Sequence, residues 1–202
     1  MPIGLKGNTD GSGAIQIGGS DAISISTGLN TTFAGTITAS GGVMYPLTSG
    51  TAIASTSGTA LDFTGIPSWV RRITVMLNGV SLNGSANLRF QLGDSGGAET
   101  TGYVSIFSYN GSSNNGGTSS SGFDLVGVGS APLEVSGQIV FSLLNSSTNT
   151  WTAMGILGAA GSAFTLLTTG SKSLSATLDR VRITTTNGTD TFDAGTINIM
   201  WE

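Results

Sequence analysis

The stretch RITVMLN at residues 72–78 carries an apolar side chain at every second position, namely Ile73, Val75 and Leu77. Successive side chains of a β-strand point to opposite sides of a sheet, so this period of two predicts a strand with one buried face. The same alternation recurs in LRFQL at 88–92, VRIT at 181–184 and INIMW at 197–201. The sequence therefore predicts a protein built from half-buried strands.

Two more uniformly apolar runs, 139–144 and 151–157, lie on either side of the polar connection SSTN at 146–149. Apolar runs of this length, joined by a short polar segment, are typical of strands without a solvent-facing side. We expect a central hairpin that is buried on both faces. Elsewhere, tight turns are predicted at Asn-Gly pairs, which accept positive φ angles and begin at Asn78, Asn83, Asn110, Asn115 and Asn187.

Helices are not expected, because no segment has a sustained i, i+3, i+4 apolar pattern and Gly, Ser, Thr and Asn occur throughout. The strand and turn spacing predicts an all-β fold. It comprises an extended Gly-rich N-terminal arm with short strands, followed by an antiparallel β-sandwich domain that is jelly-roll-like. We place the arm at residues 1–45 and the β-sandwich at residues 46–202.

The arm contains very short candidate strands, IQI at 15–17, ISI at 23–25 and FAGTIT at 33–38, separated by Gly-rich turns. Ordering a backbone costs about 1–2 kcal/mol per residue, and the arm has few large apolar side chains to offset that cost. We therefore predict that it orders against copies of itself or a larger scaffold. Its predicted assembly residues are Ile15, Ile17, Ile23, Ile25, Phe33 and Ile37.

The charge content argues against several classes of partner. Charged residues make up 9% of the chain, against roughly 25% in an average protein, and the net charge is −4. Seven cations are too few to neutralise a run of nucleic-acid phosphates, so we expect no nucleic-acid partner. No apolar run reaches the ~18 residues of a spanning helix, so we expect no membrane insertion. The first ten residues lack a secretory apolar core and the chain has no Cys, which favours either folding in a reducing cytoplasm or a fold that needs no disulfides.

The chain contains neither His nor Cys, which removes Ser-His-Asp and Cys-His catalysis and the usual zinc ligands. GDSGG at 93–97 matches the nucleophile motif of chymotrypsin-like serine proteases around Ser95, but without a histidine base we interpret it as a turn. Three carboxylate pairs in polar loops are interpreted as turn caps rather than as glycoside-hydrolysing acids. We predict no enzymatic activity, no catalytic residue and no cofactor. The pairs are Asp94 with Glu99, Asp190 with Asp193, and Asp124 with Glu134.

Two binding alternatives remain open at this stage. Asp190 and Asp193 could supply oxygen ligands to calcium within TNGTDTFDAGT at 186–196, but the spacing matches no calcium loop, so no metal site is predicted. Aromatic residues beside a polar loop offer a platform for sugars, and the candidate glycan-binding residues are Tyr103, Tyr109, Asn114 and Asn115. The competing interpretation is a core stripe, since Tyr103, Phe107 and Tyr109 share strand parity.

The block LDFTGIPSWVRRITVMLNGVSLNG at 61–84 resembles a segment of the C-terminal domains of bacteriophage tail-fibre and related virion proteins. AGTINIMWE at 194–202 is similar to their endings, and GAIQIGGSDAISISTGLNTTFAGTITA at 13–39 resembles the Gly-rich stretches that precede such domains. The resemblance implies a virion component, commonly a homotrimer with an all-β distal domain. The chain has no long shaft of repeats, which favours a capsid decoration protein or a short spike over a long tail fibre.

These observations support two hypotheses. In the first, the chain is a structural part of a tailed-phage particle, made in the host cytoplasm, that trimerises through its arm and docks on capsid or tail proteins. In the second, loops of the β domain bind host surface glycans, as a tail-fibre tip does.

Overall fold

The protein is all-β in a computed structural model that describes residues 3–7, 9, 13–17, 20–25, 31–32, 38–39, 42–43, 45–110, 115–126, 133–161 and 164–202. Strands joined in antiparallel pairs account for the secondary structure of these residues, which include no helix. None of them therefore forms a helix of the length and apolarity needed to cross a membrane. The predicted all-β antiparallel fold is confirmed.

The chain divides between Pro46 and Leu47 into two compact units, next to the boundary between residues 45 and 46 proposed from the sequence. Unit 1 contains a four-stranded antiparallel sheet in the order β1-β2-β3-β4 and a separate pair, β5-β6. Its strands are short, as the Gly-rich sequence predicts. They are β1 (Ile3–Gly7), β2 (Gly13–Ile17), β3 (Ser20–Ile25), β4 (Thr31–Thr32), β5 (Thr38–Ala39) and β6 (Gly42–Val43).

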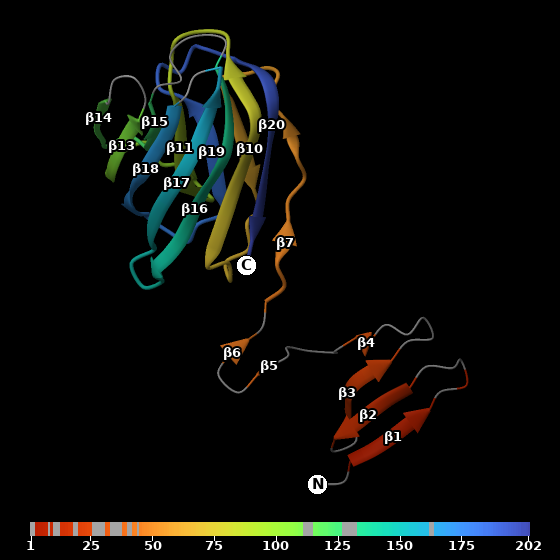
Figure 1. Ribbon diagram of the computed structural model, residues 1–202. Helices are drawn as coiled ribbons and strands as arrows, with labels where there is room; N and C mark the ends of the chain where they lie inside the picture. The colour runs from red at the N-terminus through yellow and green to blue at the C-terminus, as the bar shows by residue number, and fades with distance from the viewer. Residues whose placement is uncertain are drawn as a thin grey trace. The chain divides into compact units, whose positions relative to one another are not determined.

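Unit 2 is a sandwich of two unequal sheets (Figure 1). The larger sheet has nine strands in the order β14-β13-β18-β17-β16-β10-β20-β7, and β8 also pairs with β20. Three consecutive strands, β16 to β18, form a meander at its centre. The strands are β7 (Thr48–Ser49), β8 (Ile53–Ala54), β10 (Arg72–Leu82), β13 (Tyr103–Asn110), β14 (Asn115–Ser119), β16 (Glu134–Asn145), β17 (Thr150–Ala160), β18 (Phe164–Ser173) and β20 (Phe192–Trp201).

The smaller sheet has the order β12-β11-β19-β9, with β15 also pairing with β11. The chain passes repeatedly between the two sheets along its length, and the smaller sheet covers the inner face of the larger one. Its strands are β9 (Ala60–Thr64), β11 (Leu88–Asp94), β12 (Gly97–Ala98), β15 (Phe123–Leu125) and β19 (Arg180–Thr185).

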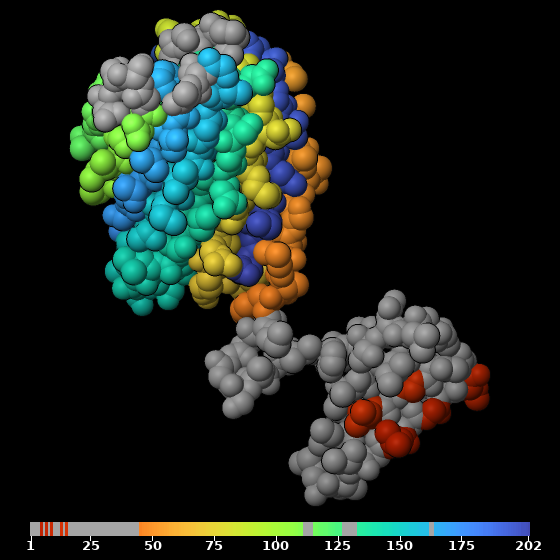
Figure 2. Space-filling view, in the orientation of Figure 1, coloured from red at the N-terminus to blue at the C-terminus, as the bar shows by residue number. Residues whose placement is uncertain are grey.

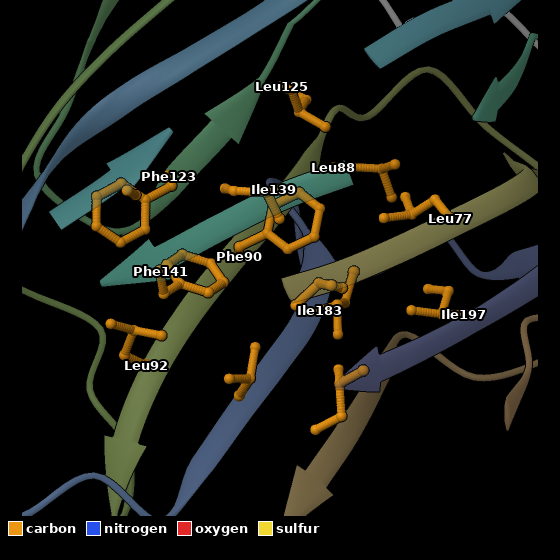
Figure 3. Close-up of a cluster of buried hydrophobic side chains, with 14 of the residues drawn as sticks. Leu77, Leu88, Phe90, Leu92, Phe123, Leu125, Ile139, Phe141, Ile183 and Ile197 are labelled. Atoms are coloured by element: carbon orange, nitrogen blue, oxygen red, sulfur yellow. The ribbon is translucent and has the colours of Figure 1, made fainter. Parts of the chain in front are cut away.

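The core of unit 2 lies between these sheets and is formed by the alternating apolar positions. From the larger sheet, Ile139 and Phe141 of β16 point inward, and from the smaller sheet Phe90 of β11 and Ile183 of β19 meet them (Figure 3). All four side chains are fully buried. Side chains of two inner faces interdigitating in this way are what holds a β-sandwich together.

The hairpin predicted around residues 146–149 is confirmed: β16 pairs with β17 in antiparallel register across that connection. The prediction that it is buried on both faces is wrong. Trp151, Ala153 and Leu157 of β17 face the core, whereas Met154 and Ile156 between them are exposed. A continuous apolar run indicates that both faces suit an apolar environment, but the single chain covers only one of them.

The Asn78-Gly79 pair does not form a hairpin turn, contrary to the prediction. It lies within β10, where the register with both neighbouring strands shifts. Gly79 has a φ of 62°, and its carbonyl oxygen occupies the space that a Cβ on Gly195 of β20 would need. Glycine serves a bulge as well as a turn, and here pairing on both sides keeps the strand continuous.

Candidate functional sites

The arm presents a row of apolar residues across three strands. The register places Leu5 of β1 opposite Ile15 of β2, and Ile15 opposite Ile23 of β3. The Leu5 side chain is 87% exposed, and that of Ile15 is partly buried. Leu5 therefore leaves apolar surface in contact with water at one end of this row.

The remaining predicted assembly residues are placed less completely. Ile17 lies at the end of β2, opposite Ile3, and Ile25 ends β3 opposite Gly13. Phe33 and Ile37 lie outside the described residues. Leu5, which the sequence analysis did not include, belongs to the same row, and the alternation of Ile3 and Leu5 in IGLKG was the signal for it.

Tyr103 is a core residue, which corrects its prediction as a glycan-binding residue. Its side chain is only 3% exposed and packs edge-on against Phe123, with ring centroids 5.1 Å apart. The Leu92 N–H donates to its hydroxyl oxygen at 2.8 Å, and the carbonyl oxygen of Glu99 lies 2.9 Å away as an acceptor. Burial raises the pKa of this phenol far above its ordinary value. For Tyr103 the core-stripe interpretation is therefore right.

Tyr109, at the other end of β13, is only half-buried. Its ring packs against Phe164 at a centroid distance of 5.4 Å, and its exposed part lines a shallow depression together with Asn115 of β14. The Asn115 side-chain oxygen accepts a hydrogen bond from the Gly116 N–H at 2.8 Å. Tyr109 and Asn115 are thus brought together, while Asn114 lies outside the described residues.

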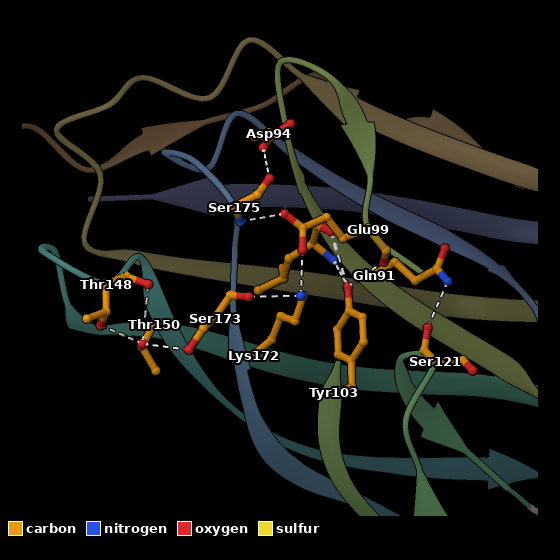
Figure 4. Close-up of polar contacts among 11 residues, drawn as sticks. Gln91, Asp94, Glu99, Tyr103, Ser121, Thr148, Thr150, Lys172, Ser173 and Ser175 are labelled. Atoms are coloured by element: carbon orange, nitrogen blue, oxygen red, sulfur yellow. Dashed lines mark hydrogen bonds and ion pairs between the residues drawn. The ribbon is translucent and has the colours of Figure 1, made fainter. Parts of the chain in front are cut away.

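A polar network that is buried at Lys172 and Asp94 joins the end of β18 to the β11–β12 hairpin (Figure 4). The Lys172 side chain is 6% exposed, and its ammonium contacts the Glu99 carboxylate at 2.5 Å and donates to the Ser173 carbonyl at 2.8 Å. It also lies 5.3 Å from the centre of the Tyr103 ring. Ser175 links two carboxylates, since its N–H donates to Glu99 and its hydroxyl donates to Asp94, each at 2.7 Å.

This network fixes the ionised forms of its carboxylates. Burial by itself disfavours ionisation of Glu99, but hydrogen bonds from Lys172 and Ser175 together hold its pKa below the ordinary value. Hydrogen bonds from Ser175 and from the Gly96 N–H lower the pKa of Asp94. Neither group is poised to exchange a proton near neutral pH, so the geometry is that of a structural tie.

The GDSGG segment is a turn, as predicted. β11 ends at Asp94, β12 begins at Gly97, and these two residues pair across the two-residue connection. The Asp94 carboxylate accepts the Gly96 N–H inside the turn at 2.7 Å. Gly93 is required here, because a Cβ on it would overlap the Gly97 carbonyl oxygen.

The other carboxylates have separate partners. Asp124 forms a bidentate pair with Arg89 across β15 and β11, at 2.7 and 2.9 Å. Asp190 accepts the Ala86 N–H at 2.7 Å, and Asp193 accepts the Ser81 hydroxyl. The described residues contain no group of three or more acidic side chains that could hold a metal ion.

One surface was missed by the sequence analysis. Five apolar side chains on the outward side of β13, β17 and β18 remain between 38% and 69% exposed. We call them the outer apolar face; they are Val104, Ile106, Met154, Ile156 and Leu167. For Met154 and Ile156 the signal was the largely apolar run at 151–157.

Comparison with known proteins adds no further constraint: the chain matches no protein-family model, no curated protein and no solved structure.

Proposed function

We propose that the chain is a structural, non-enzymatic component of a tailed-phage particle that assembles as a homotrimer through its arm. It docks on capsid or tail proteins as a capsid-decoration protein or short fibre. The observation that carries the proposal is the row Leu5, Ile15 and Ile23, with Leu5 87% exposed in a single chain. When copies of the chain cover this row, each Å² of apolar surface removed from water stabilises the assembly by roughly 25 cal/mol.

Unit 2, unlike the arm, completes its own core within one chain, which supports assigning assembly to the arm. Unit 2 buries its own core between two sheets, and its polar network and salt bridges connect strands of that sandwich. It needs no partner to complete its interior. The assignment to a phage particle rests on the resemblance of residues 61–84 and 194–202 to virion proteins, and virion localisation follows from it.

Light scattering on the full chain tests the trimer. At low micromolar concentration we expect about three times the 20.2 kDa of one chain. Leu5→Lys should reduce the mass toward one chain, because a charge placed in the row must be desolvated on assembly. Thr9→Lys, in an exposed turn position four residues away, is the matched control and should leave the mass unchanged. A wild-type monomer, or a Leu5→Lys protein that still trimerises, contradicts the proposal.

The depression at Tyr109 and Asn115 supports a second candidate function, binding of host surface glycans. A half-buried aromatic ring beside an amide side chain offers stacking together with directional hydrogen bonds. A glycan array should give binding that Asn115→Ala and Tyr109→Ala both abolish, whereas Tyr45→Ala, which changes an exposed tyrosine near the boundary between the units, should retain it. A silent array argues against this function without affecting the trimer.

A further inference from the structure

We propose that the outer apolar face is a second self-association surface, through which unit 2 packs face to face against unit 2 of another copy. This inference is independent of the arm and of the assembly proposed for it. It starts from the hairpin β16–β17, whose sequence suits burial on both sides but whose outward side is exposed in the single chain.

The exposed apolar residues form one contiguous surface. Strand register places Ile106 of β13 and Met154 of β17 on either side of Thr169 of β18. One step along the strands, Ile156 of β17 lies opposite Leu167 of β18. The strands that carry them lie side by side across the face turned toward the viewer in Figure 2.

The face is also uncharged. Apart from tyrosine, Lys172 is the one ionisable residue within β13, β17 and β18, and its side chain is buried on the inner side of the sheet. A strongly charged partner would find no complementary group here, whereas a second copy brings the same uncharged apolar surface.

Shape makes the face self-complementary. A groove of about 360 Å³ lies between Ile106, Met154, Ile156 and Leu167, so the face offers both protruding side chains and a hollow. Across a two-fold axis, a side chain of each copy enters the groove of the other. Sheets pack in this manner about 10 Å apart, as the two layers of any β-sandwich do.

The size of the face fits a weak dimer. The three strands that carry it, β13, β18 and β17, lie about 4.8 Å apart and rise about 3.3 Å per residue, which gives a face of roughly 10–15 by 25–35 Å. This area is below the ~800 Å² that each partner buries in a standard interface, so the association should depend on protein concentration. Polar residues flank it, with Gln138 of β16 opposite Ile156 and Ser108 of β13 opposite Leu167.

Sedimentation of the full chain over a concentration series tests the proposal. As concentration rises, the wild-type mass should increase to twice the mass of the species that the arm assembles. Ile156→Lys should abolish the doubling, because it places a charge at the centre of the contact. The matched control is Leu144→Lys: Leu144 is equally apolar and 69% exposed, but it lies near the hairpin end of β16 and outside the groove.

Two further variants keep the outcome decisive. Ile106→Lys, on a different strand, replaces Ile156→Lys if a melting curve shows that the latter is unfolded. Leu5→Lys separates the two interfaces, since it should remove arm assembly while the concentration-dependent doubling persists. A wild-type mass that never doubles, or a doubling that survives Ile156→Lys and Ile106→Lys, overturns the proposal.

Discussion

Replacing Glu99 with glutamine tests whether the Lys172 network is a tie that holds β18 to the β11–β12 hairpin. Lys172 is 6% exposed, and after the change its ammonium keeps only the Ser173 carbonyl and the Tyr103 ring as partners. Removing one member of a buried ion pair costs about 3–5 kcal/mol. Glu99 is 21% exposed, so water compensates in part, and we expect a loss of about 2–4 kcal/mol.

The isosteric amide isolates the charge. The oxygen of the substituted amide would still accept the Ser175 N–H, so the change removes little besides the ionic contact. The double variant Glu99→Gln, Lys172→Met removes both charges and should lie within about 1 kcal/mol of wild type, because no unpaired ion is left buried.

Urea unfolding followed by tryptophan fluorescence, at one fixed protein concentration, measures these differences. Trp151 is a suitable reporter because it is buried and lies opposite Lys172 in the β17–β18 register. The reasoning is refuted if Glu99→Gln costs less than about 0.5 kcal/mol, or if the double variant is as unstable as the single one.

Three other predictions concern stability. The pKa values of Asp94, Glu99 and Asp190 are lowered in the folded protein, so their contribution to the free energy of unfolding is present above their ordinary values of 3.8–4.5 and is lost as pH falls through the folded values. Urea midpoints measured between neutral pH and acid should show this loss of stability, and Ser175→Ala should make the loss smaller. Phe123→Ala should cost about 3–5 kcal/mol by calorimetry, because the ring is fully buried against Tyr103 and Phe141, and a cost below about 1 kcal/mol would contradict its place in the core. Gly93→Ala should destabilise the hairpin by about 1–3 kcal/mol in urea, whereas Gly158→Ala, which meets no atom within 4 Å, should have little effect; equal costs would refute the steric reason.

The polar residues show the limit of sequence reasoning about sites. Parity correctly placed Tyr103, Phe107 and Tyr109 on one side of a strand, but the degree of burial differs along that strand. Tyr103 lies under β15 and is enclosed, while Tyr109 lies near the open end beside β14. Which tyrosine meets solvent depends on where the second sheet ends, and that is a property of packing between distant segments.

The carboxylates behaved similarly. Their interpretation as loop and turn residues was right for Asp94, whose partner Gly96 is two positions away. The second partner of Asp94, Ser175, is 81 positions away and could not be found from local spacing. The same holds for Arg89 with Asp124, which meet because β15 pairs with β11.

The sequence by itself determined the strand character of this protein, because a period of two needs only the geometry of one strand to assign its faces. It also determined the absence of imidazole and thiol chemistry, because no fold can supply missing side chains. Only the tertiary structure decided which apolar face is covered. In the run at 151–157 both faces carry apolar side chains, and the packing of the two sheets buried one face, with Trp151 and Leu157, in the core and left the other, with Met154 and Ile156, at the surface.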